Sequence, residues 1–506
     1  MPTTYIHGVS VVESKDGARP IRTAASAVIG IVGTAPNAQA QAAATLLTGD
    51  VASNNALTWT AVTAGAAGNG ISAHLKDPYA NSQALSVSVS GTAITVLLAT
   101  DAAGAITSTA GDIITAIAGD AAAAALVVAA NTGASTGLGV VTANVVPQLL
   151  TGGLDDAFPL DTPTLIAGSA KEAAKLGDTG TLPQALDGIL DQGGAVVVVV
   201  RVQDVPGDPA AEKANVIGGI NAITGEYTGM QAWLGAESVV GFQPRILIAP
   251  SYSNDAAVAT EMITLADKLR GFAYLDGPNT NDAAAQNYVG NFGSKRAMVI
   301  DPWVTAFDVL SASNVTRPGT AVAAGLRAKI DTENGFWWSM SNQNIDGIIG
   351  TTRPVDFKMG DATSRANLLN QNHVTTIIRA DGWRMWGSRT TNTTDTKWAF
   401  ESVTRTADLI ADSIQTGLMW AVDRPISAQF LDDVATSVNN YIRHLVKIGA
   451  LLGGQCWPDP DLNTPDQFEQ GRVYFKYDFT APAPAEQIQL TSINVSDYYE
   501  GILPKQ

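Results

Sequence analysis

The chain has 506 residues, 46% of them hydrophobic and 15% charged. This balance is typical of folded protein, and the length exceeds one ordinary core, so we expect two to four domains. The formal net charge is −17, which disfavours binding to nucleic acid or to an anionic membrane, since both partners need basic patches.

The single cysteine, Cys456, excludes an intrachain disulfide and a thiolate zinc site. The beginning of the sequence lacks the basic and apolar stretches of a signal peptide. No run of 18 apolar residues occurs, so we expect no membrane-spanning segment and no insertion into a membrane. We therefore expect a protein that is made and folded in a reducing cytoplasm.

Residues 3–35 have the pattern of extended chain. Tyr5, Val9 and Val11 alternate imperfectly with polar residues, which predicts an arm strand or an edge strand. Residues 27–33 are continuously apolar and predict a strand that is buried on both faces. The two glycines in this run fit neither a P-loop nor a dinucleotide-binding motif, so we interpret the run as a packed strand that leads to a turn.

Residues 45–155 nearly lack charge and are rich in Thr, Ser, Ala and Gly. Residues 84–98 predict a β-hairpin that turns near Gly91, and residues 109–117 have helical spacing. Residues 121–125 predict another short helix. The motif LLTG occurs near both ends of the region, as expected for the seams of an inserted small α+β domain. A further strand is predicted around four valines, Val140, Val141, Val145 and Val146.

Strand and helix patterns alternate over residues 160–380. One predicted helix, residues 253–269, has Asn254 or Asp255 near its start and Gly271 at its end, which are typical helix boundaries. The alternation predicts an α/β layered domain with a mainly parallel sheet. The predicted strands are residues 164–167, 195–200, 245–249, 272–275, 297–300 and 374–379, and two other predicted helices are residues 182–190 and 320–331.

Two further helices are predicted at residues 405–422 and 426–452, with Pro425 between them. The second carries apolar residues at steps of three and four, and we expect Gly453 and Gly454 to end it. Its opposite face is charged, which indicates either a solvated surface or an electrostatic contact with a partner. The charged candidates are Asp432, Asp433, Arg443 and Lys447.

The sequence closes with a predicted strand at residues 471–479, a stiff Pro- and Ala-rich spacer at 481–485, and a second strand pattern at 487–495. A strand that follows a stiff spacer need not pair within its own subunit and can add to the sheet of a neighbour. The apolar candidates for such strand lending are Ile488, Leu490, Ile493 and Val495.

The sequence shows no catalytic or metal-binding constellation. The four histidines are scattered, neither H-E-x-x-H nor G-x-S-x-G occurs, and Cys456 fits a buried structural role better than a nucleophile. The acidic loop with Asp459, Asp461 and Asp466 lacks EF-hand spacing and fits a surface turn. We predict no enzyme activity, no cofactor and no metal, with a cytosolic α/β enzyme that has an accessory domain as the alternative.

Short motifs near both ends of the chain carry a family resemblance. The C-terminal motifs are WGSRT at 386–390, WAF at 398–400, WAVDRPI at 420–426, SVN at 437–439 and GALLGG at 449–454. The N-terminal motifs are HGV at 7–9, RPI at 19–21 and AVIGIVGTA at 27–35. In this order they resemble the contractile phage tail sheath family, which also occurs in related contractile injection particles. Residues 45–155 lie outside the resemblance.

The resemblance implies a structural subunit that polymerises as stacked hexameric rings around a tail tube. It implies that the N-terminal and C-terminal arms lend strands to neighbours, and that contraction drives the tube through a host envelope without nucleotide hydrolysis. The implied partners are other copies of the chain, the tail tube protein, and baseplate and tail terminator proteins. The implied location is the tail sheath of a virion that is assembled in the host cytoplasm, with another tail or shell structural protein as an alternative.

The expected architecture is an α/β and α+β multidomain chain. The resemblance implies that a tube-proximal α+β domain is built from both termini and that the charged face of the 426–452 helix is the candidate contact with the tube. The predicted segments are an N-terminal arm and first part of the inner domain at 1–30, an outer α/β domain at 31–44 and 156–380, an inserted β-rich α+β domain at 45–155, the main inner domain at 381–480, and an arm strand at 481–506.

Overall fold

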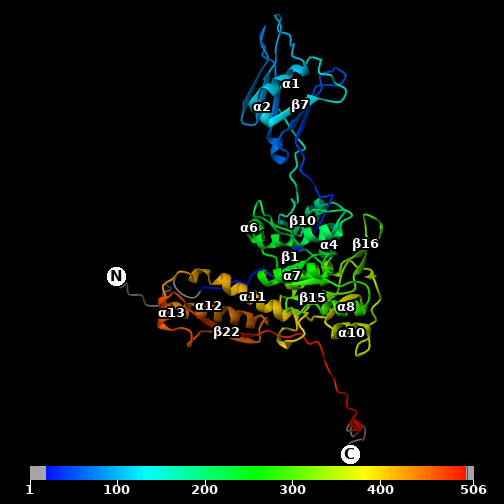
Figure 1. The fold of residues 1–506 in the computed structure, drawn as a ribbon, viewed down its shortest axis with the longest axis vertical. Coiled ribbons are helices and arrows are strands. Elements are labelled where there is room, and N and C mark those ends of the chain that lie inside the picture. Colours follow the sequence, from blue (N-terminus) through cyan, green and yellow to red (C-terminus); the bar gives the residue numbers. More distant parts are fainter. Residues whose placement is uncertain (1–18, 497, 500–506) are drawn as a thin grey trace, which may run out of the picture. The chain divides into compact units, whose positions relative to one another are not determined.

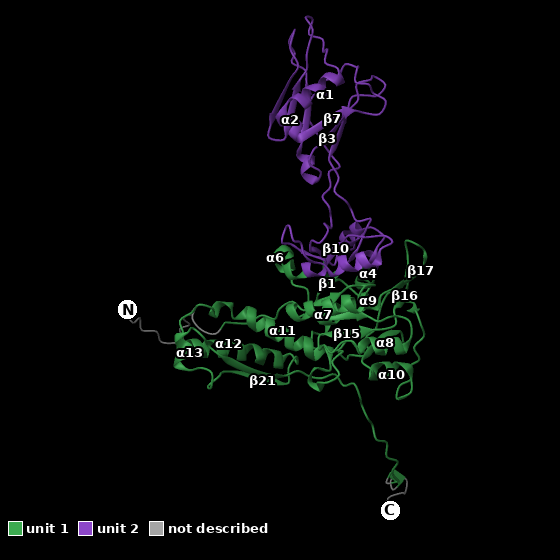
Figure 2. Cartoon of the chain, in the orientation of Figure 1, with its two compact units in different colours: residues 1–31, 185–198, 233–506 green, residues 32–184, 199–232 purple. Residues whose placement is uncertain are grey.

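The computed structural model describes residues 19–496 and 498–499 and divides the chain into two compact units (Figure 2). The arm-strand candidates Tyr5, Val9 and Val11 lie outside the described residues. Unit 1 comprises residues 1–31, 185–198 and 233–506, and unit 2 comprises residues 32–184 and 199–232.

An eight-stranded sheet has the order β20-β19-β15-β14-β13-β1-β10-β9, and the division between the units falls within β1 and β10. Neighbouring strands from β1 through β13, β14 and β15 to β19 pair in parallel, whereas β20 pairs antiparallel to β19. Strands β1, β13, β14 and β15 are buried along their whole length, which confirms the mainly parallel sheet predicted from continuous apolar runs. The bounds are β1 Val28–Thr34, β9 Thr164–Ala167, β10 Val196–Val202, β13 Ile246–Ile248, β14 Phe272–Asp276, β15 Ala297–Ile300, β19 Val374–Arg379 and β20 Trp383–Trp386.

One helix of the α/β region begins at a polar cap that the sequence predicts. Helix α7 (Ala256–Leu269) is capped by Asp255, whose carboxylate accepts a hydrogen bond from the backbone N–H of Ala257 at 2.9 Å. It ends at Arg270 in a left-handed conformation, directly before Gly271. The other helices and the small sheets are α3 Ala170–Ala173, α4 Thr181–Leu190, α5 Pro209–Ile217, α6 Ala236–Val240, α8 Asp282–Val289, α9 Gly319–Glu333, α10 Arg365–Gln371, β11 Gly219–Ile220, β12 Tyr227–Thr228, β16 Val304–Asp308, β17 Ser313–Arg317 and β18 Gly350–Thr351.

Two long helices and a two-stranded sheet form the C-terminal part of unit 1, which we call the hub (Figure 1). Helix α11 (Glu401–Gly417), helix α12 (Ala428–Lys447) and strands β21 (Gly453–Pro458) and β22 (Phe475–Thr480) make it up, and α13 (Pro465–Glu469) lies between the strands in the sequence. The hub core buries residues of both helices together with Ile21 from the N-terminal end. The hub core residues are Ile21, Phe336, Leu409, Ile410, Val438, Tyr441, Ile442, Leu445, Ala450, Leu451 and Cys456.

The predicted boundaries of the two hub helices need correction. Helix α11 spans Glu401–Gly417 rather than 405–422, and α12 spans Ala428–Lys447 rather than 426–452. The stop is Gly449, which has a positive φ of 83° and lets the chain turn away from the helix axis. Gly453 and Gly454, which we expected to end α12, instead begin strand β21.

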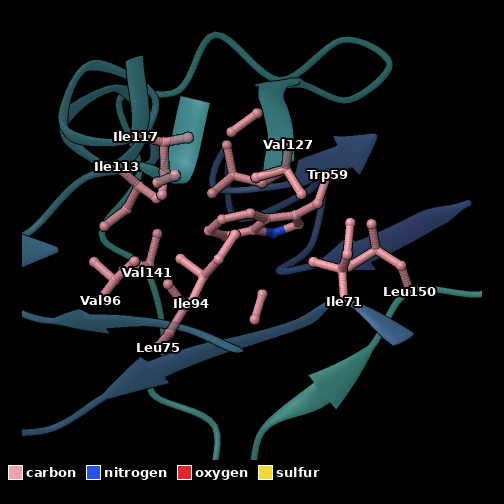
Figure 3. Close-up of a cluster of buried hydrophobic side chains, with 14 of the residues drawn as sticks. Trp59, Ile71, Leu75, Ile94, Val96, Ile113, Ile117, Val127, Val141 and Leu150 are labelled. Carbon is pink, nitrogen blue, oxygen red and sulfur yellow. The ribbon is translucent and has the colours of Figure 1, made fainter. Parts of the chain in front are cut away.

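Unit 2 contains a separate hydrophobic core, formed by residues between Ala44 and Leu150. This core surrounds Trp59, which is fully buried and donates a hydrogen bond from Nε1 to Thr48 Oγ1 at 2.9 Å (Figure 3). The predicted hairpin is confirmed as β5 and β6, and the predicted helices as α1 and α2. The elements are β2 Thr45–Thr48, β3 Leu57–Ala61, β4 Ser72–Lys76, β5 Ser86–Ser90, β6 Ala93–Leu97, α1 Ala110–Gly119, α2 Ala121–Leu126, β7 Val127–Asn131 and β8 Gln148–Leu149.

The strand predicted around Val140 and Val146 does not form, and the region is irregular except for an isolated bridge at Val140. Val141 alone of the four valines is buried, and its backbone N–H bonds the carbonyl of Ser108. The two ends of the region predicted as an insert lie close together, because Ala42 bridges Leu154 in an antiparallel arrangement. A domain whose ends meet can be accommodated within a loop.

Candidate assembly surfaces

Residues 19–26, the N-terminal strap, run without regular secondary structure across α11 and α12. The backbone N–H of Arg19 donates to Ser437 Oγ at 3.0 Å, and that of Ala24 donates to Ser413 Oγ at 3.0 Å. Thr23 bonds the hydroxyl of Tyr441 at 3.2 Å. Side chains of both helices therefore satisfy backbone groups that the strap cannot pair within itself.

An apolar contact fixes the middle of the strap. Ile21 is only 8% exposed and lies against Gly417, the last residue of α11. A β-carbon at Gly417 would lie 2.7 Å from Ile21 Cγ1, closer than van der Waals contact allows. Gly417 therefore creates the space that Ile21 occupies.

A fully buried charge network lies where the strap meets the α/β region. Arg405 of α11 donates to Asp331 Oδ1 and Oδ2 at 2.8 and 2.6 Å, and also to the carbonyl of Ser26 at 3.1 Å. Arg327 of α9 donates to the same Asp331 at 2.9 Å. Burial alone would raise the pKa of Asp331, but attraction to Arg405 and Arg327 outweighs it and lowers the pKa to about 2.

Further ion pairs tie α11 to the α/β region along its length. Arg296 forms a two-point pair with Asp408 at 2.6 and 2.7 Å, and Arg270 donates to Asp412 at 2.8 Å. Arg245 also pairs with Asp412. These charged contacts fix the hub to its own α/β region with directional bonds as well as apolar packing.

Residues 481–496 and 498–499, the C-terminal segment, differ from the predicted strand at 487–495. The segment contains no strand within the described part of this chain. Ile488, Leu490 and Ile493 are 75–90% exposed, and Val495 is 41% exposed. One surface ion pair restrains the segment near its beginning: Arg389 donates to both carboxylate oxygens of Glu486 at 2.8 and 2.5 Å.

The hub sheet consists of β21 and β22, and the side-chain amide of Asn439 in α12 bonds both the N–H and the C=O of Cys456 on the β21 edge. Strands β21 and β22 pair antiparallel from Gly453 with Thr480 to Pro458 with Phe475. No third strand joins them among the residues that the structure describes. Open edges present unpaired backbone N–H and C=O groups, which an added strand can satisfy.

The four charged candidates of α12 lie on one helix, with the carboxylates towards its beginning and the cations towards its end. Asp432, Arg443 and Lys447 are exposed, and Asp433 is half-buried. Asp433 accepts a hydrogen bond from Gln429, and Arg443 bonds Asn440. Within the described chain none of the four forms a salt bridge, and the exposed Asp432, Arg443 and Lys447 are accessible to a partner.

The candidates for chemistry in the sequence do not assemble into a site. Cys456 is buried in β21, and burial raises its thiol pKa to about 11, which suits a structural residue and not a thiolate nucleophile. Asp459 accepts hydrogen bonds from the backbone of its own turn and pairs with Lys476 at 2.7 Å. Within residues 19–496 and 498–499, no group of metal-ligating side chains converges, and no helix combines the length and apolarity needed to cross a membrane.

The strap contacts were missed by sequence reasoning. Ser413 and Ser437 look like ordinary polar positions on amphipathic helices, and Gly417 lies within the helix predicted at 405–422. A weak signal exists, because small residues on the inner face of a helix mark places where another backbone can approach closely.

Three family models match successive parts of the chain. The tail sheath protein Gp18 domain III N-terminal region matches residues 141–202, the phage tail sheath protein central domain matches 225–391, and the phage tail sheath C-terminal domain matches 393–493.

Two curated relatives differ in how much of the chain they cover. A putative prophage major tail sheath protein of Pseudomonas aeruginosa is 45% identical over 341 residues, which are 67% of this chain and 87% of that protein. The tail sheath protein of Burkholderia phage BcepMu is 30% identical over 514 residues, 98% of each chain.

Solved structures have a similar fold at lower sequence identity. The sheath complex of an extracellular contractile injection system in the contracted state has a TM-score of 0.51 at 19% identity, over 68% of this chain and 89% of that chain. The helical sheath of the anti-feeding prophage in the contracted state has a TM-score of 0.52 at 22% identity, over 66% of this chain and 89% of that chain.

Proposed function

The chain belongs to the phage tail sheath protein family and is a structural protein of a tail sheath. We propose that it polymerises as stacked hexameric rings around a tail tube and contracts to drive the tube through a host envelope. The observation that carries this proposal is the match to the BcepMu tail sheath protein, which extends over 98% of both chains. Assembly in the host cytoplasm, onto a baseplate and up to a terminator protein, belongs to the same proposal.

Strand lending between copies is the proposed means of polymerisation. The C-terminal segment exposes apolar side chains and forms no strand at home, while no third strand joins β21 and β22 among the described residues. A strand that adds to such an edge gains a row of backbone hydrogen bonds, each worth about 0.5–1.5 kcal/mol net. Tyr5, Val9 and Val11 are the proposed counterparts in the N-terminal arm.

Deleting residues 487–506 tests strand lending. We expect a folded subunit that forms no tubes, because Ile488, Leu490, Ile493 and Val495 would be missing from every junction. Negative-stain microscopy and sedimentation measure tube formation, and circular dichroism checks the fold. Normal tubes from the truncated chain would exclude a role for these residues in assembly.

The proposed domain roles follow the predicted segments. Residues 1–30 and 381–480 form the tube-proximal domain, which is supported by the packing of the strap on α11 and α12. Residues 31–44 and 156–380 form the outer α/β domain. Residues 45–155 decorate it, which is supported by the meeting of Ala42 and Leu154.

The charged face of α12 is the proposed contact with the tube, through Asp432, Asp433, Arg443 and Lys447. We expect the paired reversals Arg443→Glu and Lys447→Glu to weaken tube binding at least ten-fold without changing the fold. The matched control reverses Lys171 and Lys268, two other exposed lysines, and so changes the net charge by the same amount. Equal loss in both variants, or no loss in either, would contradict the assignment.

Removing residues 49–154 tests the peripheral role of the inserted domain. We expect the shortened chain still to form tubes, because Ala42 bridges Leu154, so that residues 43–48 need only form a short loop from Ala42 to Asp155. Loss of assembly, with the rest of the chain still folded, would place residues 45–155 in the contacts between subunits.

A further inference from the structure

The strap runs antiparallel to α11. Successive strap residues meet α11 residues that lie progressively closer to the beginning of the helix. The strap makes three such contacts with α11 and two further contacts with α12. The α11 contacts are Ile21 with Gly417, Ala24 with Ser413 and Ser26 with Arg405, and the α12 contacts are Arg19 with Ser437 and Thr23 with Tyr441.

We infer that the strap is an anchor that holds the N-terminal arm in its own subunit, so that a pull on the arm passes into α11 and α12. This inference rests on the proposed strand lending by the arm. It assigns a positioning role to Ile21, Gly417, Ser413 and Ser437, none of which takes part in the lent strand itself.

The arrangement of the contacts suits this role. Because the strap lies lengthwise along α11, a pull along it loads the contacts together instead of opening them one after another. Each serine hydroxyl accepts from a strap N–H and donates to a carbonyl of its own helix, Leu409 for Ser413 and Asp433 for Ser437. The strap is thereby bonded through both hydroxyls to the helix backbones.

A cation–π contact holds the first residue of the strap, Arg19. The guanidinium of Arg19 lies 5.5 Å from the ring centroid of Trp420, and that of Arg424 lies 4.9 Å from the same ring. Beyond Ser26 the chain enters β1, which pairs with β13 inside the sheet. The anchor therefore has fixed structure at both ends, with Trp420 at its start and β1 after it.

The test uses Gly417→Ala, which places a methyl group into the space of Ile21. We expect faster hydrogen exchange at the amides of Arg19 and Ala24, unchanged exchange in β1, and a tube yield that falls at least ten-fold. The matched control is Gly293→Ala, at an exposed glycine of unit 1 whose added β-carbon meets nothing within 4 Å. That control should assemble like the parent chain.

A second variant, Ser413→Ala with Ser437→Ala, removes the two acceptors without a steric clash and replaces Gly417→Ala if that variant fails to fold. We expect faster hydrogen exchange at the amides of Arg19 and Ala24 and a tube yield at least ten-fold lower from this variant as well. A third variant that lacks residues 1–18 tests the arm itself and should form no tubes.

The outcomes separate this inference from the proposed function. Faster strap exchange with normal tube yield, while the variant without residues 1–18 fails to assemble, would overturn the anchor and leave strand lending intact. Normal tubes from the variant without residues 1–18 would overturn strand lending by the N-terminal arm, and the anchor with it. Loss of tubes in the anchor variants and in the truncated chain, but not in Gly293→Ala, supports the anchor.

Discussion

The N-terminal strap and the C-terminal segment border the same hub but are attached to it in different ways. The strap places Ile21 in a slot and satisfies its backbone with hydroxyls of two helices. Ala481 of the C-terminal segment packs against the hub core, but Ile488, Leu490 and Ile493 are exposed, and a surface ion pair of Arg389 with Glu486 restrains the segment. The contrast indicates that the N-terminal strap is bound to its own subunit, while the C-terminal segment is available to a partner.

The energies of the two attachments differ for a physical reason. Arg405 and Asp331 are shielded from water, so removing one partner leaves an uncompensated buried charge. Arg389 and Glu486 are each about one-third exposed, so water and salt compensate when the pair is broken. Contacts of similar length therefore contribute very differently to stability.

The largest expected difference concerns these two arginines. Arg405→Met should lower the free energy of unfolding by about 3–5 kcal/mol, because Asp331 stays buried with one cation fewer. Arg389→Met, the matched change at the C-terminal segment, should cost at most about 1 kcal/mol. Urea unfolding of the subunit measures both, and equal losses would remove the distinction between the attachments.

A smaller difference is expected for two isoleucines. Ile21→Ala should cost about 2–5 kcal/mol, since a buried side chain is lost and a cavity is left. Ile488→Ala, at a position that is 77% exposed, should change the stability of the isolated subunit by less than about 0.5 kcal/mol. A large loss at Ile488 would show that the C-terminal segment packs on its own subunit.

Acid should weaken the strap network over a defined range. The folded pKa of Asp331, about 2, lies below its unfolded value of 3.8, so its ionised form stabilises the folded chain above about pH 4. That contribution, about 2–3 kcal/mol for a shift of nearly two units, is lost as the pH falls from about 4 to 2. Asp331→Asn should remove this part of the pH dependence, and an unchanged profile in acid unfolding would contradict the assignment.

The smallest expected effect is the salt dependence of the C-terminal segment. Raising the ionic strength screens the exposed pair of Arg389 and Glu486, so limited proteolysis within residues 481–496 should become faster. Cleavage within residues 19–26 should stay slow, because packing of Ile21 and hydrogen bonds to the hydroxyls of Ser413 and Ser437 hold the strap, and salt screens these contacts little. Arg389→Ala should give fast cleavage at every salt concentration.

The regular parts of the fold could be predicted from the sequence, because buried strands and buried helix faces leave recognisable patterns of apolar residues. The continuous apolar runs became strands such as β14, and the polar cap at Asp255 marked the start of α7. The strap lacks such a pattern, since its contacts come from helix hydroxyls and from a missing side chain at Gly417. The charged residues of α12 were predicted as one face, but a single sequence does not say which partner covers that face.

The position of β1 within the sheet has a consequence for folding order. This strand leaves the ribosome early, but its Ile29 pairs with Ile246, which is made only after the whole inserted domain. The inserted domain closes on itself through Ala42 and Leu154 and has its own core around Trp59, so it can fold while β1 still lacks a neighbour. Parallel pairing over such a sequence separation is slow, because the long loop must be closed before the contact forms. The nascent chain thus exposes an apolar strand during synthesis, and subunits that meet at this stage are at risk of wrong pairing before their arms have a sheet to join.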